Sequence, residues 1–384
     1  MNLEKINIVG GGPAGLYFAI LMRENYPDAS IAVYERNRED DMEGWGIVII
    51  QGTVRLIEKC DPDSYREIVD QCKRWSDVDI RHDGKQMRVR GKEYISTSRN
   101  LLVSALRKRC TSLGIDILYE RHITDPKELA DCDLLVGADG ANSSVREAYK
   151  EQFGTVVDLR KHWFVWLGTE QVFDTITHII KQTDTGTFTA ECYVYNDLHS
   201  SFIPNCSDET WRKSGFDDMS IDEAVRYMSD VFKDELDGKP LLMNEGSRWR
   251  RFPHVTNRNW SHENVLLLGD ALRTAHFSIG SGTRLAIEDA VVAAQTLSLN
   301  EDLTTALKEF ERRRRPLMER LQGIAYESML WFESVDDRID LDIIPFTYEI
   351  MTRTSSLGER SLKLTDPEFL KKYQDYQYKQ ELSE

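Results

Sequence analysis

The chain of 384 residues is 41% hydrophobic and carries a formal net charge of −16. This length allows two domains, or one large domain with an inserted lobe. The charge disfavours nucleic acid as a partner, because a phosphate backbone would require a compensating basic face. The sequence has no run of about 18 apolar residues and no signal-peptide pattern at MNLEKINIVGGGPAG, so we expect a cytoplasmic protein that does not enter a membrane.

The first part of the chain alternates strand and helix patterns. Pro13 occupies the first turn of the first predicted helix, where proline is favoured. Such alternation is typical of parallel strands in an α/β domain. The predicted elements are a strand at 4–9, a helix at 13–25, a strand at 30–35, a helix at 98–113, and strands at 115–119 and 133–137.

A different pattern begins near residue 160. Stretches such as HWFVWLGT and TFTAECYVYN are rich in β-branched and aromatic residues, and turn signals separate them. Residues 160–205 therefore predict an antiparallel sheet. The later elements are a helix at 220–233, a buried strand at 264–270, a helix at 282–298 and mainly helical sequence from residue 300 onward.

These patterns predict an α/β fold in which an inserted antiparallel β-sheet domain splits a Rossmann-like nucleotide-binding domain. The expected limits are 1–158 and 262–325 for the two parts of the nucleotide-binding domain, 159–261 for the β-rich substrate domain, and 326–384 for a C-terminal helical segment.

The first motif, Gly10-Gly11-Gly12-Pro13-Ala14-Gly15, satisfies G-x-G-x-x-G between a strand and a helix. Gly10 permits a tight turn, Gly12 lets a pyrophosphate approach the backbone, and Gly15 lets the helix pack closely on the sheet. The helix N-terminus attracts phosphate. Glu35 lies 20 residues beyond Gly15, where an acid accepts hydrogen bonds from ribose hydroxyls. This motif does not distinguish NAD from FAD.

Two further motifs follow later in the chain. Asp139 lies in LVGADG after an apolar strand, where an alternative role is to cap the next helix. Asp270 lies in LGDA at the carboxyl end of a strand, where ligands of open α/β sheets bind. The loop Gly280-Ser281-Gly282 then opens a helix, which creates a second anion-binding position.

Together the three motifs resemble those of the group A flavoprotein aromatic hydroxylases, the p-hydroxybenzoate hydroxylase type, which bind FAD. The resemblance implies that the first motif holds the ADP half of FAD, that Asp139 serves both FAD and NAD(P)H binding, and that Asp270 contacts the ribityl chain. Arg99 matches an arginine near the FAD pyrophosphate, although an exposed residue at a helix start is an equal alternative. The implied cofactor residues are Gly10, Gly12, Pro13, Ala14, Gly15, Glu35, Arg36, Gly46, Arg99, Asp139, Asp270, Gly280, Ser281, Gly282 and Thr283.

Segments such as WRRFPHVTNRNW and AHFSIGSGTRLAIEDA resemble the subgroup that hydroxylates salicylyl-CoA, 2-aminobenzoyl-CoA and an indole of violacein biosynthesis. The resemblance implies an enzyme that uses NADH or NADPH and O2 to insert one oxygen atom through a flavin C4a-hydroperoxide. We expect an aryl-CoA thioester, a hydroxy- or aminobenzoyl-CoA, as substrate. The alternatives are an indole or other aromatic intermediate of pigment or natural-product synthesis and, in another class, a non-oxygenating flavoprotein reductase or oxidase.

Aromatic residues in and near the β-rich lobe are candidates for the substrate pocket, although each is also a plausible core residue. His276 stands where many family members have proline, so it is a candidate catalytic residue; a satisfied loop histidine is the alternative. The cluster Arg248–Arg251 is the candidate patch for an anionic CoA. We expect no metal site, and a monomer or homodimer. The substrate-binding candidates are Trp45, Trp166, Tyr195, Trp249, His276 and Phe277.

Overall fold

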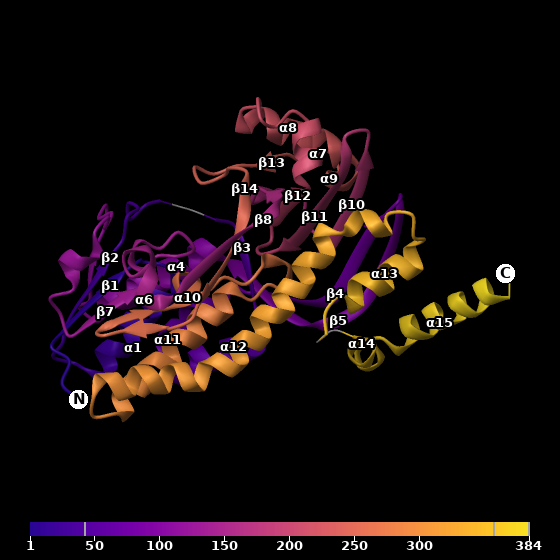
Figure 1. The fold of residues 1–384 in the computed structure, drawn as a ribbon. Helices are drawn as coiled ribbons and strands as arrows, with labels where there is room; N and C mark the ends of the chain where they lie inside the picture. Colours follow the sequence, from indigo (N-terminus) through magenta and orange to yellow (C-terminus); the bar gives the residue numbers. More distant parts are fainter. Residues whose placement is uncertain (42–43, 356–357, 383–384) are drawn as a thin grey trace.

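Two β-sheets, one mostly parallel and one mostly antiparallel, form the framework of the chain (Figure 1). The computed structural model describes residues 1–41, 44–355 and 358–382. In those three ranges, no helix is long and apolar enough to cross a membrane.

The first sheet has six strands in the order β15-β16-β7-β1-β2-β6. Neighbouring strands are parallel except for the edge pair β15 and β16. The central strand β7 is buried along its whole length, as expected of a parallel strand that is covered on both faces. This confirms the predicted parallel sheet. The strands are β1 (Lys5–Val9), β2 (Ser30–Tyr34), β6 (Asp116–Leu118), β7 (Leu134–Gly137), β15 (Ser261–His262) and β16 (Val265–Leu267).

Four helices pack against this sheet and against one another, and the bounds of three of them agree with the predicted helices at 13–25, 98–113 and 282–298. Tyr17 and Phe18 of α1 are fully buried against the sheet and its other helices. The side chains of Asn25 and Tyr26 donate hydrogen bonds to α11 carbonyls, which fixes α1 against α11. These helices are α1 (Pro13–Asn25), α4 (Arg99–Ser112), α11 (Gly282–Leu299) and the long α12 (Leu303–Glu333).

The second sheet has the order β13-β9-β12-β11-β10-β4-β5-β3, and a ribbon of β8 and β14 branches from β12. Its neighbours are antiparallel except for β4 and β10. The strands are β3 (Gly46–Ile49), β4 (Lys73–His82), β5 (Lys85–Ser98), β8 (Thr155–Phe164), β9 (Leu167–Thr169), β10 (Ile176–Thr183), β11 (Gly186–Val194), β12 (Ser200–Cys206), β13 (Leu241–Leu242) and β14 (Arg250–Asn257).

The antiparallel strands β8 to β12 confirm the sheet predicted for residues 160–205. Strands β3, β4 and β5, however, join the same sheet from a segment that the sequence analysis placed in the first nucleotide-binding part. The limits at 158 and 261 therefore do not separate the two sheets. The sequence signal was weak because β4 and β5 carry many charged residues, as in KRWSDVDIRH and KQMRVRGKEYISTS.

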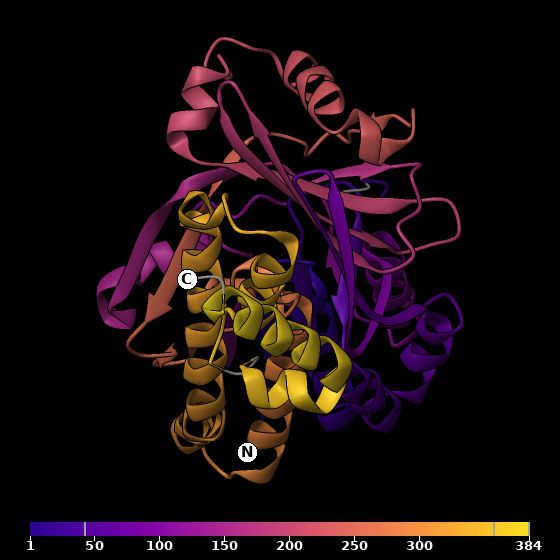
Figure 2. The same ribbon diagram turned by 90° about the vertical axis from the view of Figure 1, so that its right-hand side faces the viewer.

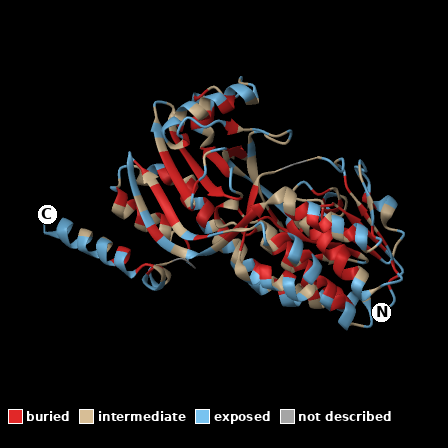
Figure 3. Ribbon diagram, turned by 180° about the vertical axis from the view of Figure 1, so that it is seen from behind, coloured by how far each residue is buried: buried red, intermediate tan, exposed pale blue. Residues whose placement is uncertain are grey.

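Further helices cover the two faces of the second sheet, above and below it in Figure 2. On one face Phe188 and Phe202 pack against Trp211, Phe216 and Met228. On the other face the C-terminal helices pack against β4, β5 and β10. Figure 3 shows buried strands in both sheets and a largely exposed final helix. These helices are α7 (Asp208–Lys213), α8 (Ile221–Val231), α9 (Lys233–Leu236), α13 (Ile343–Thr352), α14 (Glu359–Thr365) and α15 (Pro367–Glu381).

Candidate active site

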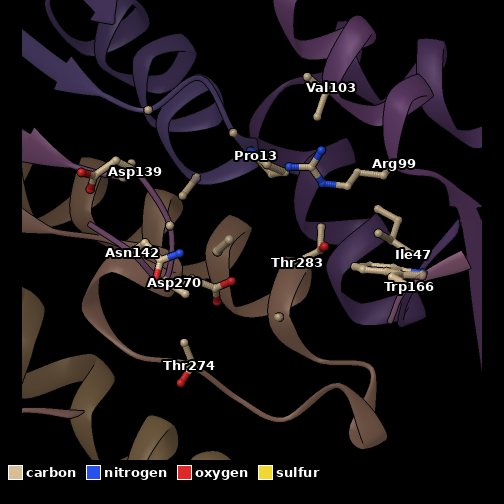
Figure 4. Close-up of a pocket in the computed structure, with 18 of the residues that line it drawn as sticks. Pro13, Ile47, Arg99, Val103, Asp139, Asn142, Trp166, Asp270, Thr274 and Thr283 are labelled. Atoms are coloured by element: carbon tan, nitrogen blue, oxygen red, sulfur yellow. The ribbon is translucent and has the colours of Figure 1, made fainter. Parts of the chain in front are cut away.

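A cavity of about 590 Å³ is lined by residues from both sheets, and the three sequence motifs meet there. Figure 4 shows Asp139, Asp270, Arg99 and Trp166 around this one space, with the guanidinium of Arg99 directed toward Pro13. The volume lies within the range of small-molecule and cofactor pockets, roughly 300–1,000 Å³. The motif residues on the cavity wall are Gly10, Gly12, Pro13, Ala14, Asp139, Asp270, Gly280, Ser281, Gly282 and Thr283.

The N-terminus of α1 opens into the cavity. Gly10 has a φ of +110°, and a Cβ there would overlap the carbonyl oxygen of Ala138, so only glycine fits. At Gly12 a Cβ would meet no described atom within 4 Å, so the backbone is open on that side. Gly12 is the N-cap, and no described side chain caps the helix. The first-turn N–H groups are therefore available to an anion in the cavity.

The N-terminus of α11 opens into the same cavity from the opposite part of the chain. Gly280 has a φ of +58° and turns the backbone into the helix, which begins at Gly282. Ser281 is the N-cap, but its hydroxyl donates to the carbonyl of Ile279 instead of accepting from the helix. Two long helices thus direct their positive ends at one space.

Glu35 and Asp139 each make backbone hydrogen bonds at the edge of the cavity. The two carboxylate oxygens of Glu35 accept from the N–H groups of Gly11 (2.7 Å) and Asn37 (2.9 Å). Oδ2 of Asp139 accepts from the N–H of Ser144 (2.7 Å), so this aspartate does help to cap α5 (Ser144–Ala148). Its Oδ1 is buried and has no hydrogen-bond partner among the described residues, which leaves it available to a ligand.

Asp270 reaches solvent through the cavity that it lines. Protein surrounds the carboxyl on its other sides, and this burial raises its pKa despite the nearby charges of Arg273 and Arg99. Arg146 connects the second and third motifs, because its guanidinium donates to the carbonyls of Ala141 (2.6 Å) and Ala271 (3.1 Å).

A buried ion cluster fixes the third motif from behind. Asp289 of α11 is fully buried and accepts from Arg273 at 2.8 Å and from Arg314 at 2.9 Å. It also accepts from the N–H of Gly269, which begins α10 (Gly269–Leu272). Arg314 belongs to the run Arg312–Arg315 of α12, and the cluster accounts for its burial.

The end of the cavity away from the nucleotide motifs is aromatic. Trp166 and Phe277, both predicted, line it together with Tyr193, another aromatic residue of the β-rich lobe, and with Phe164 and Ile203, which the sequence analysis did not select for the site. The hydroxyl of Tyr193 donates to the carbonyl of Gly46 at 2.9 Å, which orients the ring. Alternate residues of β11 share one face, and only the strand's register indicates which of them face the cavity.

Several predicted residues lie outside the described lining of the cavity and instead support it. Trp45 packs over Gly168 and donates from Nε1 to the carbonyl of Trp166 at 3.1 Å. A Cβ on Gly46 would overlap the ring of Tyr195, and a Cβ on Gly15 would overlap the carbonyl oxygen of Gly10. For Gly15 this is the close packing of helix on sheet that the motif led us to expect, whereas for Gly46 it is a packing role that the sequence did not indicate.

Trp249 and His276 are also placed differently from the prediction. Trp249 stacks on Phe216, with ring centroids 5.0 Å apart, in the hydrophobic cluster of the second sheet. His276 is buried behind the cavity wall, with Nδ1 2.8 Å from the hydroxyl of Ser278. Burial lowers the pKa of His276 to about 3, so the ring is neutral near pH 7.

Comparison with known proteins agrees with this geometry. Residues 114–323 match the FAD binding domain family. The chain is 35% identical over 370 residues to salicyloyl-CoA 5-hydroxylase from a Streptomyces species, covering 94% of this chain and 71% of that enzyme. The chain belongs to the FAD-dependent aromatic monooxygenases.

A second relative of this monooxygenase has a different named substrate. Protodeoxyviolaceinate monooxygenase from Chromobacterium violaceum is 33% identical, with 92% of this chain and 95% of that enzyme covered. The fold is shared with 2-methyl-3-hydroxypyridine-5-carboxylic acid oxygenase, with a TM-score of 0.71, 19% identity, and coverage of 92% of this chain and 96% of that one.

The cavity of this monooxygenase is locally basic although the chain is acidic. Among the described residues that line it, seven arginines outnumber five carboxylates. The arginines include Arg248 and Arg250, which are exposed, and Arg251, which donates to the carbonyls of Arg160 and Leu159. The full sets are Arg36, Arg99, Arg107, Arg121, Arg248, Arg250 and Arg251, against Glu35, Asp41, Asp139, Glu191 and Asp270.

Proposed function

We propose that the predicted cofactor residues on the cavity wall hold FAD in one extended path. The pyrophosphate binds at the N-terminus of α1 beside Arg99, and the ribose binds beside Glu35. The ribityl chain lies near Asp270, and the flavin ring lies by the loop that begins α11. Two open helix N-termini fit the anionic pyrophosphate, and the unpartnered Oδ1 of Asp139, within the described part of the chain, fits a hydroxyl donor of the dinucleotide.

We propose that NADH or NADPH is the reductant of the flavin, and that it binds without a separate nucleotide-binding domain. The sequence contains one G-x-G-x-x-G motif, at Gly10 to Gly15, and FAD is assigned to it. The reduced cofactor, when bound, supplies the activation of O2, while the protein positions the substrate and excludes water.

The substrate of this proposal is an aryl-CoA thioester that carries a ring hydroxyl or amino group. The basic lining of the cavity supports a CoA thioester, because the CoA tail is anionic. The chain as a whole has a charge of −16, so an excess of arginines in the cavity is a local feature. Trp166, Tyr193 and Phe277 supply flat apolar walls for the ring. Nε1 of Trp166 is a buried donor with no partner among the residues described, and it is suited to a substrate carbonyl.

A substrate panel tests both the reaction and the thioester. Purified holoenzyme is mixed with NADH or NADPH and with salicyloyl-CoA, 2-aminobenzoyl-CoA, the two free acids or indole. We expect the thioesters to stimulate NAD(P)H oxidation and to gain one oxygen atom by mass. Oxygenation of a free acid or indole, but of neither thioester, would overturn the thioester; oxygenation of no compound in the panel would overturn the proposed hydroxylation.

A further inference from the structure

Glu191 and His178 form a buried ionisable pair on the wall of the second sheet. They are direct cross-strand partners in the register of β10 and β11. Their side chains are 6% and 4% exposed, and Oε2 of Glu191 lies 4.0 Å from Nδ1 of His178. Neither of these two atoms has a hydrogen-bond partner within residues 1–41, 44–355 and 358–382. A buried carboxylate oxygen without a partner is costly, so its retention requires an explanation.

The retention of Glu191 is explained by its position on the wall of the cavity. Glu191 and Tyr193 alternate with Cys192 along β11, and both line the cavity, whereas Cys192 packs into the hydrophobic cluster on the opposite face. Among the described lining residues, Glu191 is the acid contributed by the second sheet at the aromatic end. The other four acids belong to the nucleotide end: Glu35, Asp41, Asp139 and Asp270.

The charged and ionisable groups around Glu191 come from several elements. Tyr94 of β5 is a half-buried neighbour, and Arg353 follows the end of α13. Arg353 donates to the hydroxyl of Ser328 and to the carbonyls of Ile350 and Ser278, so its hydrogen bonds are directed elsewhere. On α12, the ring of Phe332 packs against that of His178, with the ring centroids 5.7 Å apart.

These surroundings set the ionisation of the pair. Burial raises the pKa of Glu191 to about 7, and the positive charge of Arg353 opposes that change only in part. Burial and Arg353 together lower the pKa of His178, so its ring is neutral. A carboxyl that titrates near neutral pH beside a substrate pocket has the property required of a general base.

We propose that Glu191 is the catalytic base of the hydroxylation and accepts a proton from the ring hydroxyl or amino group of the substrate. The O–H or N–H bond breaks, its electron pair stays on the substrate, and the proton moves to the Glu191 carboxylate. The electron pair increases the density at the ortho and para carbons, and one of them bonds to an oxygen atom of O2 as the O–O bond breaks. The other oxygen atom is reduced to water by the two electrons that NAD(P)H supplies through the cofactor, and the substituted ring carbon then loses its hydrogen as a proton. This inference rests on the proposed function.

The test compares Glu191→Gln with Glu235→Gln. Glu235 of α9 is also a largely buried carboxyl of this lobe, paired with Lys181 at 2.8 Å and placed outside the described cavity lining. With salicyloyl-CoA, we expect Glu191→Gln to retain bound FAD and NAD(P)H oxidation, to lose roughly 100-fold or more in hydroxylated product, and to release hydrogen peroxide instead. Glu235→Gln should match the wild type in all four measurements.

The pH dependence identifies the base without relying on one variant. The base must be ionised, so product formation by the wild type should rise as pH increases through about 7. Glu191→Asp, which keeps a carboxyl, should restore part of the activity and the rising limb, and Glu191→Gln should lack that limb. If Glu191→Gln does not fold, the wild-type limb and Glu191→Asp still decide the question.

The outcomes separate this inference from the proposed function. A wild type that hydroxylates salicyloyl-CoA with a flat profile between pH 6 and 8, or a folded Glu191→Gln within twofold of the wild type, would overturn the role of Glu191 alone. A wild type that hydroxylates no aromatic compound would overturn the proposed function and this inference together.

Discussion

The two ends of the cavity are built in different ways. The nucleotide end is made mainly of backbone: two helix N-termini, the turn at Gly10 and the turn at Gly280. The aromatic end is made of side chains on the second sheet and its neighbours, such as Trp166, Tyr193 and Glu191. A backbone-built end tolerates little change in residue type, whereas a side-chain-built end can change its ligand through single substitutions.

The largest expected effect is at the ion cluster behind the nucleotide end. Asp289→Asn leaves Arg273 and Arg314 buried without a full countercharge, and we expect the free energy of unfolding to fall by about 3–5 kcal/mol. Urea denaturation measures this change. Glu309→Gln is the matched control, because Glu309 also pairs with two arginines but both of these are exposed, and it should change stability little. Equal losses in the two variants would contradict the argument.

The next largest effect distinguishes the roles of two glycines of the first motif, Gly10 and Gly12. Gly10→Ala forces an alanine into a φ of +110° and against the Ala138 carbonyl, which costs about 1–3 kcal/mol for the backbone alone. We expect a protein with a lower melting temperature that binds no FAD. Gly12→Ala should melt like the wild type but bind FAD roughly 10-fold more weakly, about 1.4 kcal/mol, because its methyl group enters the cavity. Melting curves and the yellow flavin absorbance distinguish the two outcomes.

At the aromatic end, Glu191 should reduce stability at high pH. Its pKa is about 7 in the folded protein against an ordinary value of 4.5, so the unfolded chain ionises first as pH rises. The folded protein therefore loses stability between these two values and regains none above them. Glu191→Gln removes this loss, so at pH 8 it should be more stable than the wild type by about 1–3 kcal/mol, with little difference at pH 4. A variant that is less stable at pH 8 would contradict this ionisation.

The smallest effect is at the cavity mouth. Arg248→Glu reverses one exposed charge, and we expect the KM for salicyloyl-CoA to rise about 3- to 5-fold with little change in kcat. The difference should shrink at high ionic strength, because salt screens exposed charges. Arg226→Glu on α8 is the control, an exposed arginine outside the described cavity lining. A KM that responds equally to both substitutions would indicate a general charge effect.

The same contrast explains what the sequence could predict. Gly10, Asp139 and Asp270 were found because a backbone site leaves glycines and acids at fixed places next to strands. Their convergence on one cavity follows from the parallel sheet. The bounds of α1, α4 and α11 were also predictable, because proline, glycine and apolar periodicity mark helix ends and faces.

The aromatic end left no comparable pattern in the sequence. Tyr195 and Trp249 were selected as aromatic residues of the β-rich lobe, but strand register and packing direct them to other contacts. Glu191 was missed because a single carboxyl in a strand has no motif, and its importance depends on burial and on its place opposite His178. Residues 73–98 were missed because charged side chains on their exposed face mask the strand pattern.

The parallel pairing of β4 with β10 links two separate segments of the chain, so neither segment can be excised without disrupting the second sheet. Because the chain enters the second sheet before α4 and again after β7, excision of residues 159–261 would remove neighbours from strands that remain behind. Chimeras made by transplanting that segment alone should therefore aggregate. The aromatic end of the cavity therefore depends on strands from two separate segments of the chain. Its specificity should be changed by substitutions within the intact fold and not by exchange of one segment.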